Sequence, residues 1–315
     1  MDDCFASIDL GSHTARLLIS KKSGAPGSLL PLIRRRTYVR LADHFDPSDE
    51  KTIQPVAVDR AVHAMKDFAR IIRAHHALSV HAVATGVFRE ARNARAILNR
   101  IREETGIRVR PVSGHEEALL TGKGILDGMA PGERSFVAFD LGGRSVELIR
   151  GRGRAIKEAG SMPLGAMTLT QAFLHHDPPC EDEYTRLAAH IDRSLTHAAP
   201  AIERGALVVG TGGTVATLTC MAHRSIPDEG ALNRLHGGAL REGDVMALFR
   251  GMKGKPVKDR IGFCGLDEGR ADVILAGSLV VLRILHHYQT RQLVFSKSDI
   301  LEGILLHINE GEGHG

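Results

Sequence analysis

Two acidic residues flank a glycine-rich turn in the stretch AFDLGGRSVELI, residues 138–149. Asp140 ends one apolar run and Glu147 lies in the next, which predicts a β-hairpin with Gly142 and Gly143 at its tip. Glycines leave backbone amides open to an anion, and two carboxylates would repel that anion unless a cation lay between them. The stretch is therefore a candidate phosphate-binding turn with a divalent metal, although a single copy favours an ordinary hairpin with a polar tip.

A second copy of this stretch lies near the N-terminus. SIDLGSHTARLLI, residues 7–19, aligns with AFDLGGRSVELIR without a gap, so that Asp9 matches Asp140 and Arg16 matches Glu147. Duplicated units usually form similar halves of one fold. We therefore expect one hairpin in each half, with the two turns facing a cleft that binds a phosphate group from both sides.

A third glycine-rich loop, VVGTGGTVATL over residues 208–218, follows a predicted strand and precedes a predicted helix. Amides at the start of a helix can bind an anion, and Thr211 and Thr214 can add hydroxyl donors. A tight turn between a strand and a helix, without a bound anion, explains the same sequence equally well. Arg89 also lies just after a predicted strand, where a lone arginine is usually solvated or paired.

The elements that must position these residues alternate between strands and amphipathic helices. Asn93 is expected to cap a helix that Gly106 ends, and longer helices are expected over residues 181–203 and 270–288. This order predicts an α/β protein built twice. Domain I covers residues 1–125 and domain II covers residues 126–315, and a last helix at about 299–312 can pack back on domain I.

Composition excludes several classes of function. The 315 residues allow two domains, and 41 Lys and Arg against 37 Asp and Glu do not indicate nucleic-acid binding. The four cysteines lack C-x-x-C spacing, which argues against a zinc ribbon or a disulfide framework, and most of the 17 histidines are expected at the surface. No signal stretch is present, and the longest uncharged apolar run is about half of a membrane span. We expect a cytoplasmic protein without a membrane or nucleic-acid partner.

Together these motifs resemble the exopolyphosphatase and guanosine pentaphosphate (pppGpp) phosphohydrolase family of the actin-like ATPase superfamily. The resemblance runs in order along almost the whole chain. Besides the two DLG turns, the matching stretches are ATGVFREARN, VSGHEEALLTGKGI, SMPLGAMTLTQAF, VVGTGGTVATL, GRADVILAG and SDILEGILL. It implies an α/β fold of two duplicated ribonuclease-H-like (actin-like ATPase) domains with a cleft between them. It also implies release of terminal phosphate from inorganic polyphosphate or a guanosine polyphosphate, with Mg²⁺ or Mn²⁺ as cofactor.

The same resemblance assigns roles to residues. Asp140 and Glu147 would hold the metal and order the water, and Glu117 would be the general base. The substrate contacts that it implies are Asp9, Gly11, Ser12, His13, Thr14, Arg16, Arg89, Gly142, Gly143, Arg144, Ser145, Gly212, Gly213 and Thr214.

Three positions depart from the family pattern. Arg144 replaces the usual third glycine, His13 replaces the common asparagine, and Leu119 replaces the usual arginine. An arginine at the turn either adds a phosphate contact or crowds the loop. Since the acids remain, we expect activity with an altered substrate preference. The chain ends where a further helical portion begins in long members, so we expect a short, two-domain member.

Several functions stay open at this point. An exopolyphosphatase that favours short chains is the first, and a pppGpp 5′-phosphohydrolase that makes ppGpp is the second. A non-catalytic module that senses (p)ppGpp is the third. A sugar kinase of the same superfamily would need a transfer acceptor rather than a water-activating Glu117. A homodimer is left open.

Overall fold

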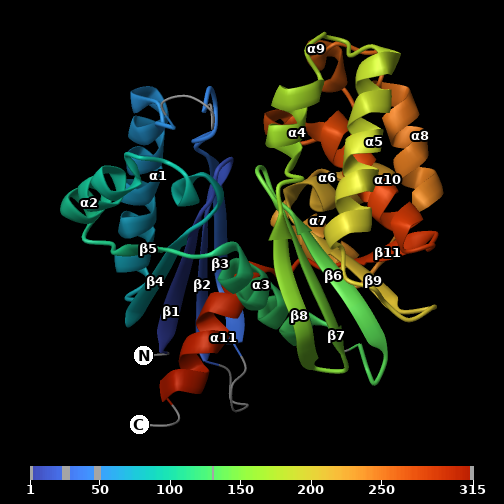
Figure 1. The fold of residues 1–315 in the computed structure, drawn as a ribbon. Helices are drawn as coiled ribbons and strands as arrows, with labels where there is room; N and C mark the ends of the chain where they lie inside the picture. Colours follow the sequence, from blue (N-terminus) through green and yellow to red (C-terminus); the bar gives the residue numbers. More distant parts are fainter. Residues whose placement is uncertain (1–2, 23–28, 46–50, 130, 313–315) are drawn as a thin grey trace. The chain divides into compact units, whose positions relative to one another are not determined.

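The structure is a computed structural model that describes residues 3–22, 29–45, 51–129 and 131–312. The chain divides into two compact units, each built on one β-sheet (Figure 1). Unit 1 comprises Met1–Gly124 and Ile300–Gly315, and unit 2 comprises Ile125–Asp299. The second unit therefore ends at Asp299, and the last helix belongs to the first unit. Among the described helices, none combines the length and the apolar character that a membrane crossing requires.

Unit 1 holds a five-stranded sheet in the order β3-β2-β1-β4-β5. Strands β1, β2 and β3 are antiparallel neighbours, whereas β4 and β5 run parallel to β1. The strands are β1 (Cys4–Leu10), β2 (Thr14–Lys22), β3 (Leu29–Tyr38), β4 (Ser79–Ala84) and β5 (Val109–Pro111). The helices are α1 (Pro55–Ala74), the 3₁₀ turn η1 (Gly86–Arg89), α2 (Ala94–Thr105), α3 (Gly114–Gly128) and α11 (Ile300–Glu312).

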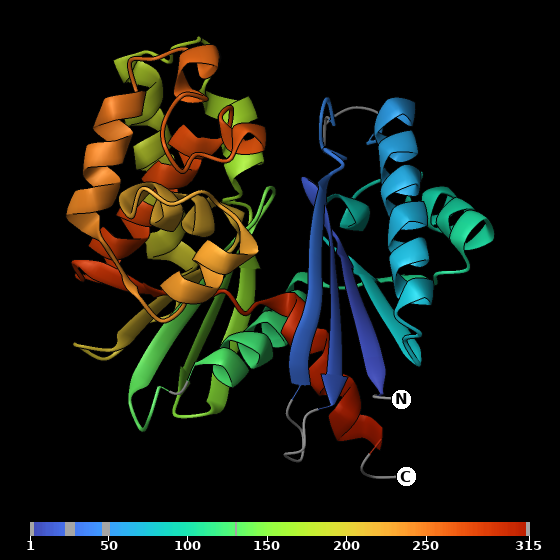
Figure 2. The ribbon, with the colours of Figure 1, turned by 180° about the vertical axis from the view of Figure 1, so that it is seen from behind.

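Helices cover both faces of the first sheet, which explains why every residue of β1 is buried. Side chains alternate between the two faces of a strand. Phe5 of β1 and Leu18 of β2 form an apolar cluster with Leu301 and Leu305 of α11, and the Ser7 hydroxyl donates to the Leu301 carbonyl at 2.8 Å. Figures 1 and 2 show α1 and α2 on the opposite face.

Unit 2 repeats this topology. Its sheet has the order β10-β11-β9-β6-β7-β8, in which β6, β7, β8, β9 and β11 reproduce the order and directions of β1 to β5. The strands are β6 (Ser135–Leu141), β7 (Val146–Arg152), β8 (Ala155–Met162), β9 (Leu207–Thr211), β10 (Ala239–Arg241) and β11 (Gln292–Phe295). The prediction of an α/β protein built from two similar halves is thus confirmed.

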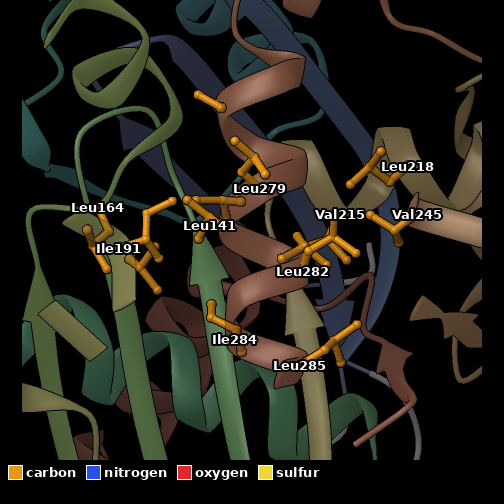
Figure 3. Packing of buried hydrophobic residues seen from close by; sticks show 14 of the residues in the cluster. Leu141, Leu164, Ile191, Val215, Leu218, Val245, Leu279, Leu282, Ile284 and Leu285 are labelled. Carbon is orange, nitrogen blue, oxygen red and sulfur yellow. The ribbon is translucent and has the colours of Figure 1, made fainter. Parts of the chain in front are cut away.

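One apolar helix, α10 (Ile274–His287), lies at the centre of the second core. It packs on four other helices, and Figure 3 shows its Leu279 and Leu282 beside Leu141 of β6 and Val215 of α6. A helix that is apolar on most faces needs such a central position. The remaining helices are α4 (Ala166–Phe173), α5 (Glu181–Ala198), α6 (Gly213–Ala222), α7 (Glu229–Leu235), α8 (Glu242–Met252), α9 (Val257–Arg260) and the 3₁₀ turn η2 (Glu268–Arg270).

Both predicted ends of α2 are correct in position, with Asn93 at the N-cap and Gly106 at the C-cap. Gly106 does end the helix, in the left-handed conformation with φ +79°. The Asn93 side chain, however, makes no capping hydrogen bond to α2. Its amide instead accepts from the Ile53 N–H at 3.0 Å and donates to the Ile53 carbonyl at 2.9 Å. The side chain thereby ties α2 to the segment before α1, a contact between residues far apart in sequence.

The two long helices of unit 2 are shorter than predicted. Helix α5 ends at Ala198, because Ala199 precedes Pro200 and is extended, with ψ 137°. Helix α10 begins at Ile274, because the turn η2 and its following residues occupy the start of the predicted range.

Candidate active site

The two DLG turns have the same backbone geometry. Gly11 N–H donates to the Thr14 carbonyl in the first turn, and Gly142 N–H donates to the Ser145 carbonyl in the second, both at 3.0 Å. In each hairpin the acid at the end of the first strand pairs directly with the residue seven positions later. Direct cross-strand partners point to one face of the sheet. This spacing therefore places the two functional side chains of each hairpin side by side.

The carbonyl groups of the second turn are bound by the segment that starts α4. A Cβ on Gly165 would lie 2.1 Å from the Arg144 carbonyl carbon, so only glycine lets this segment approach the turn so closely. The bonds run from Ala166 N to Gly142 O, from Met167 N to Gly143 O and from Gly165 N to Arg144 O, at 3.0, 2.8 and 3.1 Å.

The corresponding segment of unit 1, which follows β3, binds the first turn in the same way. The Ser12 carbonyl accepts from Ala42 N–H at 3.2 Å, and the His13 carbonyl accepts from the Val39 and Arg40 N–H groups at 3.0 Å. The carbonyl groups of each turn are thus occupied by hydrogen bonds on one side, and backbone amides of the turn are available on the other side. In the described ranges, the amides of Ser12 and Gly143, which are equivalent in the two turns, donate to no protein acceptor. Such amides can bind an anion.

Charge distinguishes the two hairpins. In unit 1, Arg16 Nη2 lies 2.7 Å from Asp9 Oδ2, and the Thr85 hydroxyl donates to Asp9 Oδ1 at 3.0 Å. The guanidinium neutralises a carboxylate that is almost fully buried. Asp9 and Arg16, which the sequence analysis gave as substrate contacts, therefore bind each other.

In unit 2 the position of the arginine is taken by a second acid. Asp140 pairs directly with Glu147, and both side chains are buried, with 8% and 1% of their surface exposed. Glu147 Oε1 accepts from the hydroxyls of Ser145 and Ser161, both at 2.7 Å, which fixes its orientation. Two buried carboxylates side by side repel each other, and a divalent cation removes that repulsion. An all-oxygen donor set is the kind that Mg²⁺ and Mn²⁺ prefer, so these residues fit the expected metal.

The third glycine loop lies against this pair. Gly212 has φ +91°, and a Cβ at that position would lie 2.4 Å from Asp140 Oδ1. The parallel register places Asp140 opposite Thr211, the last residue of β9. The loop that begins α6 therefore adjoins the acid pair, as expected for residues at the carboxyl ends of neighbouring parallel strands.

The sequence analysis missed one arginine at this loop. A Cβ on Gly213 would lie 1.7 Å from Arg270 Nη2, so the guanidinium of this buried arginine contacts the loop glycine. Arg270 belongs to the matching stretch GRADVILAG, to which no role was assigned. An arginine inside a family motif was the available signal.

Three of the predicted contact residues have partners within the protein. The Thr214 side chain is fully buried against Gly277 of α10, on the core side of the loop. The His13 ring is buried and meets the Tyr38 ring edge-on, with 5.1 Å between centroids. The Ser12 hydroxyl accepts from the Val87 N–H at 2.8 Å, which fixes the first turn against η1. Thr14, also buried, is the first residue of β2.

Glu117 and Arg89 form an ion pair. Glu117 lies in the first turn of α3, where its N–H donates to the Ser113 carbonyl at 2.9 Å, and Arg89 ends η1. The Glu117 side chain has 13% of its surface exposed and the Arg89 side chain 25%. The structure thus brings together the predicted base and one predicted substrate contact.

Comparison with known proteins settles the family. The sequence profile described as the Ppx/GppA phosphatase family matches residues 18–311. This chain belongs to the Ppx/GppA phosphatase family. Exopolyphosphatase 2 of Mycobacterium tuberculosis is 29% identical over 314 residues, which cover 96% of this chain and 97% of that protein. Exopolyphosphatase 1 of Mycobacterium leprae is 29% identical over 315 residues, covering 98% of this chain and 90% of that protein.

Solved Ppx/GppA structures share the fold. The crystal structure of the Aquifex aeolicus Ppx/GppA family member is 27% identical, with a TM-score of 0.83 and full coverage of both chains. An exopolyphosphatase from Cytophaga hutchinsonii is also 27% identical, with a TM-score of 0.89 and 98% coverage of both chains. The expected pair of ribonuclease-H-like, actin-like domains is confirmed, and the Ppx/GppA protein described here is a phosphoanhydride hydrolase.

Proposed function

We propose that this protein is an exopolyphosphatase, which releases terminal phosphate from inorganic polyphosphate by metal-assisted attack of water. The buried pair of Asp140 and Glu147 carries the proposal, because it adjoins a turn whose Gly143 amide has no protein acceptor in the described ranges. A cation and a bound phosphate together balance the charge of the two carboxylates. The two mycobacterial relatives, which are named exopolyphosphatases, support the same substrate.

The residues of unit 2 bind and orient the substrate in this proposal. The amide of Gly143 and the loop of Gly212 and Gly213 donate to phosphoryl oxygens, and Arg144 and Arg270 supply positive charge. A Mg²⁺ or Mn²⁺ ion held by Asp140 and Glu147 would neutralise charge on the transferred phosphoryl group. We leave Thr214 out of these contacts, because its side chain lies in the core.

Glu117 accepts the proton of the attacking water. Its carboxylate is paired with Arg89, which keeps the oxygen atoms in one orientation. Arg89 then acts as a positioning residue for the base.

We further propose that short chains are preferred and that the enzyme releases its substrate between cleavages. A long polyphosphate needs a row of basic side chains, here called the phosphate track, that contact its successive phosphates. Several basic groups that could extend this track are paired with acids: Arg34 with Glu302, Arg89 with Glu117, and Arg40 with Asp43. A short track binds few phosphates, so a shortened chain dissociates before the next cleavage.

Phosphate release from a short polyphosphate and from pppGpp, measured side by side with Mg²⁺, tests the substrate. We expect faster release from polyphosphate, and gels of a long-chain digestion should show intermediates that shorten gradually. Faster release from pppGpp would replace the proposal with a pppGpp phosphohydrolase, and tight binding of pppGpp without any release would indicate a sensing module. Direct conversion of long chains to phosphate without intermediates would contradict the short track.

A further inference from the structure

A basic pocket lies in unit 1, on the sheet face that α3 and α11 cover. It has a volume of about 250 Å³, and none of its lining residues belongs to either glycine turn. Leu120 of α3 and Ile304 of α11 contribute an apolar wall. The polar lining is His81, Arg108, Arg110 and His307.

Strand register explains why these basic residues gather. Val83 of β4 lies opposite Arg110 of β5 in their parallel pairing. Residues two apart on a strand share a face, so His81 and Arg108 share the face of Val83 and Arg110. Val83 packs with Leu120 and Ile304, which identifies this face as the one covered by α3 and α11.

The charge around the pocket is positive. Arg110 Nη2 lies 2.6 Å from Glu116 Oε1, and at the rim Lys123 Nζ lies 3.1 Å from His307 Nδ1. Arg108 is exposed and has no ion-pair partner in the part of the chain that the structure describes. Of the two arginines that line the pocket, Arg110 is thus paired with Glu116, whereas the positive charge of Arg108 is not balanced by an ion pair within the described residues.

We propose that this pocket is a second anion site, which binds a small inorganic phosphate anion of two or more negative charges, such as diphosphate. The paired N–H groups of an arginine guanidinium can donate two parallel hydrogen bonds to phosphate oxygens. An apolar wall strengthens these contacts by excluding water. The volume lies below the range of about 300–1,000 Å³ typical of sites for larger organic ligands, which favours an inorganic anion over a nucleotide. The proposal concerns binding away from the turns, so it stands independently of the proposed hydrolysis.

Charged residues on an edge strand have another use, since they prevent pairing with a second sheet. Strand β5 is an edge strand, so Arg108 and Arg110 would serve that purpose without any ligand. Binding measurements separate the two explanations.

Calorimetric titration of the full-length, metal-free protein with methylenediphosphonate, a diphosphate analogue that water does not cleave, tests the site. Metal-free conditions weaken binding at the acid pair, whereas the pocket needs no metal. We expect saturable binding to the wild type and a loss of affinity of about tenfold or more in Arg108→Gln, as for one lost charged hydrogen bond. Arg95→Gln is the matched control, because Arg95 is an exposed arginine of α2 outside the pocket.

Three results would overturn the site. The first is the absence of metal-independent binding to the wild type. The second is an equal affinity in Arg108→Gln and Arg95→Gln, with circular dichroism confirming that both variants are folded. The third is tighter binding of a nucleoside diphosphate than of methylenediphosphonate, which would contradict the inorganic assignment.

Discussion

Asp140 lies directly opposite Glu147 across the hairpin of β6 and β7, and both carboxylates are buried. The equivalent hairpin of unit 1 has the same backbone but places Arg16 opposite Asp9. The same hairpin backbone thus carries an ion pair of Asp9 and Arg16 in unit 1 and a pair of acids, Asp140 and Glu147, in unit 2. This difference in charge is the reason why we propose a metal site at the second hairpin and not at the first.

Glu117→Gln should lower kcat by about 10²–10⁴ and leave KM nearly unchanged, because a general base acts on the water and not on substrate binding. Steady-state phosphate release measures both constants. Glu116→Gln is the matched control, since Glu116 is the neighbouring acid of α3 and pairs with Arg110. Turnover close to wild type in Glu117→Gln, with a large loss in Glu116→Gln, would transfer the role of base to Glu116.

Gly212→Ala should abolish most activity. The new Cβ would lie 2.4 Å from Asp140 Oδ1, in a backbone conformation that costs other residues about 1–3 kcal/mol. Gly205→Ala is the control, because Gly205 has a similar φ of +80° but no atom within 4 Å of the new Cβ. Both variants are compared by phosphate release and thermal unfolding. Equal activity in the two would show that the contact with Asp140 is unimportant.

Arg144→Gly restores the glycine that is usual in the family. Since the side chain is expected to bind ground state and transition state alike, KM for short polyphosphate should rise about tenfold with little change in kcat. The backbone of residue 144 packs on Gly165 and should be unaffected. A lower KM in the variant would mean that the arginine crowds the turn.

The surroundings of Glu183 predict that the stability of the fold falls at acidic pH. It lies at the start of α5, where burial alone would raise its pKa. Hydrogen bonds from the His176 ring and the backbone amides of Cys180 and His175 outweigh burial and lower the pKa from 4.5 to about 2. The ionised carboxylate therefore stabilises the fold fully above pH 4.5, and this contribution is lost as the pH falls towards 2.

Glu183→Gln should thus lower Tm at pH 7, by the equivalent of about 1 kcal/mol for a lost helix cap, and the deficit should shrink below pH 4.5. Asp182→Asn, an exposed acid in the same helical turn, should show no such trend. A deficit for Glu183→Gln that is constant from pH 7 to pH 3 would contradict the assignment.

Local patterns predicted the hairpins, because the pairing of Asp140 with Glu147 follows from turn length and strand alternation within one short segment. The duplicated topology followed from the repeat of that segment. Contacts between distant segments were not accessible in this way. The carbonyls of the second turn are bound by Gly165 and its neighbours, and Gly213 contacts Arg270, because helices bring these segments back to the sheet. Arg89 and Glu117 were both selected from motifs, but their pairing depends on how η1 and α3 pack.

The most direct test of the central claim is a Mg²⁺ titration of phosphate release from a short polyphosphate, with protein freed of metal. We compare the wild type with Glu147→Gln and with Glu158→Gln, an exposed acid of β8 that pairs with Arg150. The wild type and Glu158→Gln should be inactive without metal and recover at the same Mg²⁺ concentration. Glu147→Gln should stay inactive or need at least about tenfold more Mg²⁺, as for a lost charged ligand. Full wild-type activity in excess chelator, or an unchanged Mg²⁺ dependence in Glu147→Gln, would contradict the account.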